Sequence, residues 1–323
     1  MRKTYQELLS RVDIAQPLGE MLQEIARHYE LGRIEQSRLI TQGYDDLNVL
    51  LMCEQGPFVA KIFNKSKASA TIEDYIRVQT ALATRRLPVP RICSVSGAGL
   101  FRVAGRFQET FVCVSEFFEG ENFVEVPPQR DDILAIARFL AELHQLPFAI
   151  TPSYDSWGTF NLPGEFARKQ ALVSDETRTL VAPLADAIAN IRLGEAHRRI
   201  IHGDLQRKHV LKDGDGRYCI LDFGCMDFGY PVVDLGIYLA LFCLEGSDPS
   251  QTHDLIVEVL KTYLSCAPLP SEHIAALGTL IRATWASYLL TAEFLMRGGD
   301  RSRQTRQWRH FALTSLRTFD IGS

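Results

Sequence analysis

The chain has 323 residues, of which 46% are hydrophobic and 23% charged, a composition typical of globular domains. This length is long for one hydrophobic core and suits two lobes. The net charge of −4 argues against a broad nucleic-acid-binding surface, and no apolar run approaches the roughly 20 residues that span a bilayer. We therefore expect neither nucleic acid nor membrane as a partner.

The spacing of apolar residues predicts helices at the start of the chain and strands after them. Residues 1–30 form an N-terminal helical segment, with Pro17 near a helix start. Alternation of apolar and polar residues then predicts strands over 33–42, 48–54 and 58–63. Apolar residues on one face predict a helix over 66–84, and further extended stretches follow at 91–95, 100–104 and 109–118. Residues 31–119 are thus expected to form a first lobe with a mostly antiparallel sheet and one long helix.

After Gly120 the periodicity is almost wholly helical. The expected helices are 130–145, 164–192, 234–245, 252–266 and 270–320, the last in at least two pieces. A short pair of strands interrupts them near residues 199–222. Residues 120–323 are therefore expected to form a second, mainly helical lobe.

The interrupting segment contains two aspartates, each at the edge of a short apolar stretch. Asp204 lies in His202-Gly203-Asp204-Leu205 after one stretch, and Asp222 ends another in Ile220-Leu221-Asp222-Phe223-Gly224. Phosphoryl transfer requires one carboxylate that accepts a hydroxyl proton and another that binds magnesium. The pattern indicates this chemistry.

The segment resembles the catalytic and metal-binding loops of the aminoglycoside phosphotransferase branch of the protein-kinase-like superfamily, whose text is close to HGDLxxxNVL followed by IDFG. The resemblance extends from about Thr41 to Leu239. It implies an α+β, protein-kinase-like bilobal fold, with an N-terminal antiparallel sheet lobe bearing one long helix and a mainly helical C-terminal lobe. The resemblance further implies that the lobe of residues 31–119 binds the nucleotide and that the lobe of residues 120–323 carries the catalytic loop and the substrate site. It also implies that Asp204 is the catalytic base, that Asp222 is a Mg²⁺ ligand and that Asp234 ties the catalytic loop down.

On the nucleotide side, Lys61 lies in the middle of the apolar strand 58–63. A lysine there buries its stem and offers its ammonium group to an anion. The strand resembles the VAIK strand of kinases, whose lysine contacts the α and β phosphates. The resemblance implies a glutamate partner on the next helix, for which Glu73 is the best match, with Asp74 beside it.

Two further segments are assigned to the nucleotide by their position. The turn around Gly43 resembles the glycine-poor phosphate-covering turn of small-molecule kinases, although an ordinary hairpin turn would need no ligand. Residues 114–120 correspond to the hinge, where main-chain groups of Glu116 and Phe118 are expected to contact the base. Main-chain contacts leave the choice between ATP and GTP open.

The chain departs from the family pattern at two points. His209 stands where the family usually has asparagine, and macrolide kinases and some aminoglycoside kinases also carry histidine there. His209 either ligates the metal directly, contacts it through a bridging water, or orders the loop. Gly229-Tyr230-Pro231 replaces the usual Gly-Asp-Pro and so removes one acidic group near the substrate side. The substrate specificity of family members therefore cannot be assigned to this chain from the resemblance.

The favoured function is therefore a Mg²⁺-dependent small-molecule kinase that transfers the γ-phosphoryl group of ATP or GTP to a hydroxyl of a metabolite or antibiotic. A nucleotide-binding pseudokinase and, less favoured, a Ser/Thr protein kinase are the alternatives. Candidate substrate contacts are Glu245, Glu293 and Asp300, and Arg207 and Lys208 could neutralise phosphate charge.

The expected location is the cytoplasm, because the first residues lack the apolar stretch of a signal peptide. The seven cysteines show no metal-ligand pairing such as CxxC. Most of the cysteines lie inside apolar runs, which is typical of free thiols in a reducing compartment. The sequence indicates no oligomeric state.

Overall fold

The computed structural model describes residues 5–41, 43, 45–244 and 249–319. The chain divides into two compact units. The first comprises Met1–Glu121 and Leu211–Leu221, and the second comprises Asn122–Val210 and Asp222–Ser323. The segment 211–221, expected in the helical lobe, thus groups with the first unit.

The first unit is built on a five-stranded antiparallel sheet in the order β1-β2-β3-β5-β4. The strands are β1 (Ile34–Ile40), β2 (Leu47–Cys53), β3 (Gly56–Ile62), β4 (Phe101–Ala104) and β5 (Glu109–Glu116). The extended stretch predicted at 91–95 forms only isolated bridges, because Ser96 and Gly97 adopt positive φ and turn the chain at once. A second, three-stranded sheet has the order β6-β8-β9: β6 (Glu121–Asn122), β8 (Val210–Lys212) and β9 (Tyr218–Ile220).

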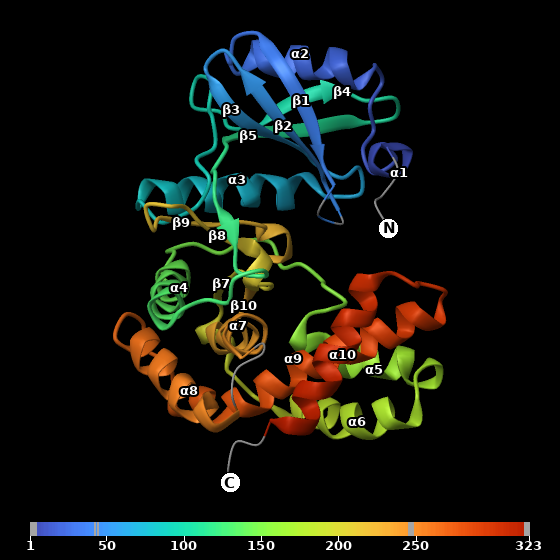
Figure 1. Cartoon of the computed structure of the whole chain (residues 1–323), viewed down its shortest axis with the longest axis vertical. Helices are drawn as coiled ribbons and strands as arrows, with labels where there is room; N and C mark the ends of the chain where they lie inside the picture. The colour runs from blue at the N-terminus through green and yellow to red at the C-terminus, as the bar shows by residue number, and fades with distance from the viewer. Residues whose placement is uncertain (1–4, 42, 44, 245–248, 320–323) are drawn as a thin grey trace. The chain divides into compact units, whose positions relative to one another are not determined.

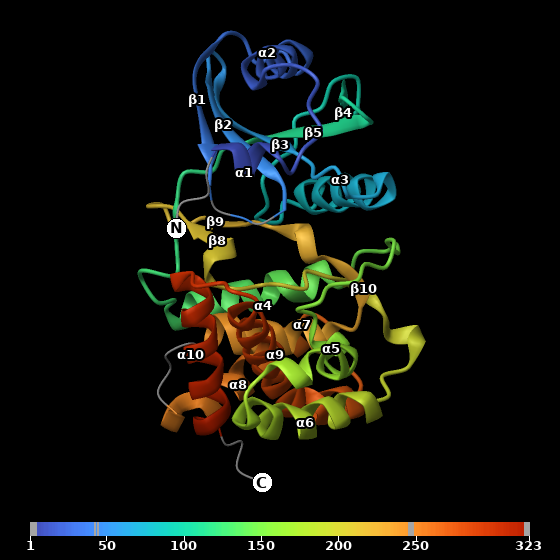
Figure 2. The same cartoon turned by 90° about the vertical axis from the view of Figure 1, so that its right-hand side faces the viewer.

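Helices cover both faces of the five-stranded sheet. They are α1 (Tyr5–Leu9), α2 (Leu18–His28) and α3 (Ser69–Thr84). Figures 1 and 2 show α2 and α3 on opposite sides of the sheet. Val112 belongs to the core shared with α2, whereas Cys113 packs with Ile72 of α3, because successive strand residues point to opposite faces.

The second unit is mainly helical. Its helices are α4 (Arg130–Leu143), η1 (Thr159–Asn161), α5 (Leu162–Lys169), η2 (Gln170–Leu172), α6 (Asp175–Asn190), η3 (Glu195–His197), η4 (Arg207–His209), η5 (Phe223–Cys225), α7 (Pro231–Tyr238), the π-helical turn η6 (Leu239–Cys243), α8 (Pro249–Leu264), α9 (Ser271–Arg297) and α10 (Arg303–Thr318). Strands β7 (Arg199–Ile201) and β10 (Asp227–Gly229) pair antiparallel among them. His202, Gly203 and Asp204 follow directly after β7.

Two helix boundaries differ from the predicted ones for local reasons. The helix expected over 164–192 is broken, because the Ser174 side chain accepts the Thr177 backbone N–H and starts α6 anew. The predicted break within 270–320 falls at Gly298 and Gly299, where Gly299 has a φ of +100°.

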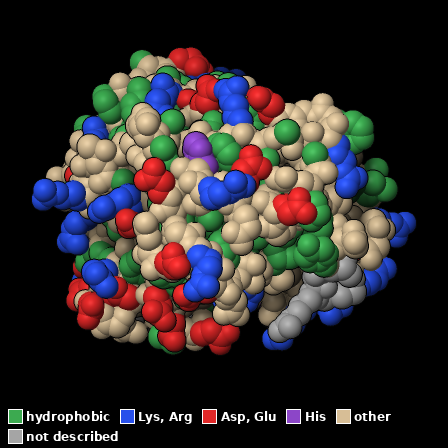
Figure 3. Space-filling view, turned by 90° about the horizontal axis from the view of Figure 1, so that it is seen from above, with side chains coloured by type: hydrophobic (Ala, Val, Ile, Leu, Met, Phe, Trp, Pro, Cys, Tyr) green, Lys and Arg blue, Asp and Glu red, His purple; other side chains and the backbone are tan. Residues whose placement is uncertain are grey.

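The surface carries both signs of charge. Figure 3 shows acidic and basic side chains interspersed over the face seen from above. Across the part of the chain that the structure describes, none of the helices combines the length and apolar character that crossing a bilayer requires.

Candidate active site

In the first unit, Lys61 is held by a buried carboxylate. Lys61 lies in the middle of β3, opposite Asn48 of β2 and Cys113 of β5. Its Nζ is 2.9 Å from Oδ2 of Asp46, whose side chain is 3% exposed. Lys67 Nζ approaches the same oxygen at 2.8 Å. Asp46 is therefore shared by two ammonium groups.

The electrostatics show that Asp46 is ionised. Burial raises the pKa of this carboxyl, but the positive charges of Lys61 and Lys67 outweigh it and lower the pKa to about 2. Oδ1 accepts the backbone N–H of Asn64 at 3.0 Å, which fixes the carboxylate. Asp46 thereby orients the Lys61 ammonium group.

The predicted pairing of Lys61 with Glu73 is wrong. The Glu73 side chain is 59% exposed, and its carboxylate lies 3.9 Å from Arg102. Neighbouring helix residues are turned by about 100° from one another, so Asp74, and not Glu73, lies on the buried face of α3. Asp74 forms an ion pair with Arg77 at 2.8 Å.

The two segments assigned to the nucleotide are partly occupied by internal contacts. Gly43 has a φ of +99°, which explains the glycine, and its carbonyl accepts a hydrogen bond from Arg11; the neighbours Gln42 and Tyr44 lie outside the described residues. The N–H of Glu116 donates to the Arg91 carbonyl. Among the described hydrogen bonds none uses the Phe118 N–H, so Phe118 keeps a donor.

In the second unit, a buried aspartate fixes the loop that carries Asp204. Asp234 accepts the backbone N–H groups of His202 at 2.7 Å and Gly203 at 2.9 Å, and it lies 3.1 Å from His144 Nε2. Burial raises the pKa of Asp234, but His144 and His202 outweigh it and hold the pKa below its ordinary value. Gly203 is required, because its φ is +79° and a Cβ there would lie 2.2 Å from the Cys225 carbonyl oxygen. The loop is anchored immediately before Asp204.

Two donors hold one carboxylate oxygen of Asp204. Its Oδ1 accepts hydrogen bonds from Gln206 Nε2 at 2.6 Å and from the Tyr288 hydroxyl at 3.1 Å. Oδ2 lies 3.6 Å from His209 Nδ1, beyond hydrogen-bond distance. The carboxylate is thus oriented through Oδ1, while Oδ2 keeps the lone pairs that a base needs.

Sequence reasoning missed Tyr288. Burial and the negative charge of Asp204 raise the pKa of its hydroxyl, so Tyr288 stays protonated and donates. It lies on α9, 84 residues after Asp204. The available signal was a tyrosine within the apolar run of that helix, since a buried tyrosine hydroxyl usually has a partner.

The structure brings His209 and Asp222 together with Asp204. His209 Nδ1 is 2.7 Å from the Asp204 carbonyl oxygen, and Nε2 is 3.2 Å from Asp222 Oδ2. Burial lowers the pKa of His209, but the carboxylates of Asp204 and Asp222 outweigh it and raise the pKa above its ordinary value. Asp222 adopts the left-handed conformation with a φ of 63° and is 45% exposed, so its carboxylate reaches solvent.

The side chains near Asp222 suit magnesium better than a metal ion that is coordinated entirely by protein side chains. Among the described residues there is no group of three or more His, Cys, Asp or Glu side chains that could hold an ion. Magnesium is usually bound by one or two carboxylates together with substrate phosphates and water. An exposed Asp222 beside His209 fits that requirement.

An aromatic wall flanks Asp204, formed by Trp157, Tyr288 and Trp308. The Trp157 ring centroid lies 5.1 Å from that of Tyr288 and 5.0 Å from that of Trp308. Lys208 Nζ is 6.0 Å from the centroid of the Trp308 ring. The negative charge of Asp155 contributes to raising the pKa of the Tyr288 hydroxyl. The wall thus has one basic and one acidic neighbour.

The other candidate substrate contacts have structural partners. The Glu293 carboxylate binds Ser174 and Arg309, and Asp300 accepts from Ser302 and Thr305 in the cap of α10. Arg207 is buried and its Nε donates to the Phe242 carbonyl in the π-helical turn, so this side chain also has a structural partner. Glu245 lies outside the described residues.

Residues 37–269 match the phosphotransferase enzyme family. The chain is 28% identical over 277 residues to a homoserine kinase of Methylocella silvestris and 26% identical over 275 residues to one of Rhodospirillum rubrum. The alignments cover 82% of both chains in the first case and 81% in the second.

Solved structures share the fold at low identity. An amicoumacin kinase in complex with AMP-PNP, Ca²⁺ and Ami has a TM-score of 0.71 at 14% identity, covering 97% of this chain and 96% of that one. A microcompartment-associated aminopropanol kinase has a TM-score of 0.65 at 18% identity, covering 92% and 95%. These matches confirm the predicted α+β, protein-kinase-like fold.

Proposed function

Because the chain belongs to the phosphotransferase enzyme family and is a kinase that acts on a hydroxyl group of small molecules, we propose that it transfers the γ-phosphoryl group of ATP to homoserine in a Mg²⁺-dependent reaction. The observation that carries the proposal is the position of His209, whose ring lies 3.6 Å from the carboxylate of Asp204 and 3.2 Å from that of Asp222. Asp234 anchors the loop that carries Asp204 and His209. The relatives do not support the alternatives of a pseudokinase or a Ser/Thr protein kinase.

Asp204 is the base in this mechanism. Its Oδ1 is occupied by Gln206 and Tyr288, so Oδ2 accepts the proton of the acceptor hydroxyl. As the acceptor oxygen bonds to the γ-phosphorus, the bond from that phosphorus to the β–γ bridging oxygen breaks and ADP leaves. The two donors hold the carboxylate in one orientation before the acceptor arrives, which lowers the entropic cost of reaching the transition state.

Asp222 would hold Mg²⁺, with His209 as a direct or water-bridged neighbour. The bound ion would neutralise phosphate charge. His209 also fixes the loop, because its Nδ1 hydrogen bonds to the Asp204 carbonyl. This second role depends only on residues of the chain and holds whether or not imidazole ligates the metal.

For the nucleotide, Lys61 is the proposed phosphate contact, oriented by Asp46. Gly43 would lie over the phosphates, and the carbonyl of Glu116 with the N–H of Phe118 would meet the base. The amicoumacin kinase that shares the fold was solved with AMP-PNP, an ATP analogue, which favours ATP over GTP.

Homoserine is the proposed acceptor because the homoserine kinases align over four fifths of the chain. The surroundings of Asp204 support an amino acid. Homoserine carries an ammonium group, for which Asp155 is an acidic partner, and a carboxylate, for which Lys208 is a basic one. The aromatic wall would exclude water around the short aliphatic stem.

None of the seven cysteines, all of which the structure describes, forms a disulfide, which supports a reducing compartment and hence the cytoplasm as the place of the reaction.

The proposal is tested with the purified full-length chain, ATP, Mg²⁺ and a panel of acceptors. The panel contains L-homoserine, 1-amino-2-propanol, ethanolamine, choline and an aminoglycoside, with ³¹P NMR detecting a new phosphomonoester. L-2-Aminobutyrate, which lacks the hydroxyl, is the matched control, and GTP is run in parallel. We expect the highest kcat/KM with homoserine and ATP. Preference for another acceptor would reject homoserine, and release of inorganic phosphate alone would reject transfer to the panel.

A further inference from the structure

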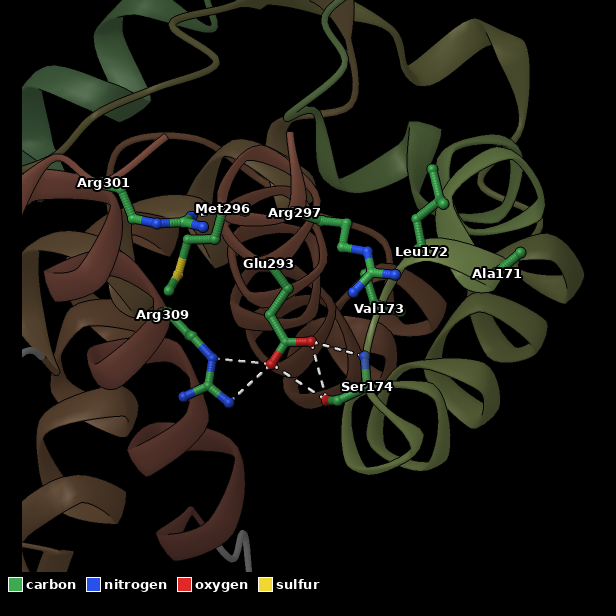
Figure 4. Close-up of a pocket in the computed structure, with 9 residues that line it drawn as sticks. All are labelled: Ala171, Leu172, Val173, Ser174, Glu293, Met296, Arg297, Arg301 and Arg309. Carbon is green, nitrogen blue, oxygen red and sulfur yellow. Dashed lines mark hydrogen bonds and ion pairs between the residues drawn. The ribbon is translucent and has the colours of Figure 1, made fainter. Parts of the chain in front are cut away.

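A pocket of about 750 Å³ opens in the second unit between the segment that precedes α6, the end of α9 and the start of α10. Figure 4 shows Arg297, Arg301 and Arg309 around it, with Glu293 and Ser174 close to Arg309. None of its lining residues contacts Asp204. Arg297 lies nine residues after Tyr288 on α9, about 13 Å along the helix axis.

The single carboxylate of this pocket is already neutralised. Glu293 is 8% exposed and accepts the Ser174 backbone N–H at 2.9 Å and the Ser174 hydroxyl at 2.9 Å. Arg309 donates to it through Nε and Nη2, each at 2.8 Å. Burial raises the pKa of Glu293, but the hydrogen bonds from Ser174 outweigh it and hold the pKa below its ordinary value, so the group is a carboxylate.

The two remaining arginines are left without a carboxylate partner among the described residues. The Arg297 side chain makes no hydrogen bond or ion pair with any of them, and the Arg301 side chain donates only to the backbone carbonyls of Met296 and Asp300. The Asp300 side chain, although near Arg301, is bound by Ser302 and Thr305. The pocket therefore has two guanidinium groups in excess of its acidic groups.

From this charge balance we propose that the pocket binds a small organic phosphate, with the dianionic phosphate on Arg297 and Arg301. Guanidinium groups match phosphate oxygens in geometry and charge. A volume of about 750 Å³ exceeds what a bare phosphate fills, and Leu172 and Met296 offer apolar contacts to an organic part. The ligand would join α9 to α10 and to the segment before α6.

The test uses isothermal titration of the full-length chain with glycerol 3-phosphate, without nucleotide and at constant ionic strength. Succinate, a dicarboxylate of similar size, and inorganic phosphate are titrated in parallel. The double variant Arg297→Ala/Arg301→Ala removes both contacts. Arg303→Ala is the matched control, because Arg303 is also exposed on this part of the chain but does not line the pocket.

We expect one glycerol 3-phosphate site in the wild type and in Arg303→Ala, and a loss of affinity of about tenfold or more for each arginine removed in the double variant. Weaker binding of inorganic phosphate would support the apolar contacts. Undiminished binding by the double variant, or none by the wild type at millimolar ligand, would overturn the site. Equal affinity for succinate would overturn the assignment to phosphate. Circular dichroism confirms that each variant is folded.

Discussion

Asp46→Asn tests the idea that a buried carboxylate holds Lys61 in place. The substitution removes the negative charge that Lys61 and Lys67 share, while the amide oxygen can still accept the Asn64 N–H. Folding lowers the pKa of Asp46 from 3.8 to about 2. At about 1.4 kcal/mol for each pKa unit, ionisation of Asp46 stabilises the fold by roughly 2 kcal/mol at neutral pH.

The pH dependence has a defined sign. Because the folded-state pKa is depressed, the stabilisation is complete above the unfolded-state value of 3.8 and is lost as pH falls through about 2. Urea unfolding followed by circular dichroism should thus show Asp46→Asn roughly 2 kcal/mol less stable than wild type at pH 7 and at pH 5. Near pH 3 the difference should shrink to about half.

Asp45→Asn is the matched control, since this neighbouring aspartate is exposed and makes no ion pair with a described residue. It should stay within about 0.5 kcal/mol of wild type. Equal stability of Asp46→Asn and Asp45→Asn at pH 7 would refute the reasoning.

Three further predictions concern the second unit. Tyr288→Phe should lower kcat about tenfold and change the KM for ATP little, because it removes one donor to Asp204 Oδ1 while Gln206 remains. An unchanged kcat in steady-state kinetics would contradict this role of Tyr288. Asp222→Ala should abolish the effect of Mg²⁺ on nucleotide affinity, and titrations that show the same metal dependence as wild type would place the ion elsewhere. His209→Asn should retain substantial activity, whereas His209→Ala should lose much more; equal rates for the alanine variant and wild type at saturating Mg²⁺ would make His209 a bystander.

The sequence predicted the parts of the molecule that local pattern determines. The alternation at 48–54 and 58–63 became β2 and β3 because each strand has one face against an apolar core. Asp204, His209 and Asp222 could be grouped in advance, since a short strand and turn bring residues of one motif together. Their catalytic and metal-binding roles remain predictions.

What the sequence did not reveal depends on side-chain direction and on contacts between distant segments. Glu73 and Asp74 are equivalent in composition, and only the register of α3 decides which one is buried. Tyr288 reaches Asp204 from a helix far along the chain. Glu293 looked like a free acid, although Arg309 and Ser174 neutralise it.

The central claim is that Asp204 is the base for phosphoryl transfer to a hydroxyl. The most direct measurement compares the rate of phosphohomoserine formation by wild type and Asp204→Asn at saturating ATP and Mg²⁺, with ATP affinity determined by titration. Asparagine keeps the contacts of Oδ1 but accepts no proton, so the rate should fall by about 10² to 10⁴ with ATP affinity preserved. A folded Asp204→Asn protein that forms the product at the wild-type rate would contradict the claim.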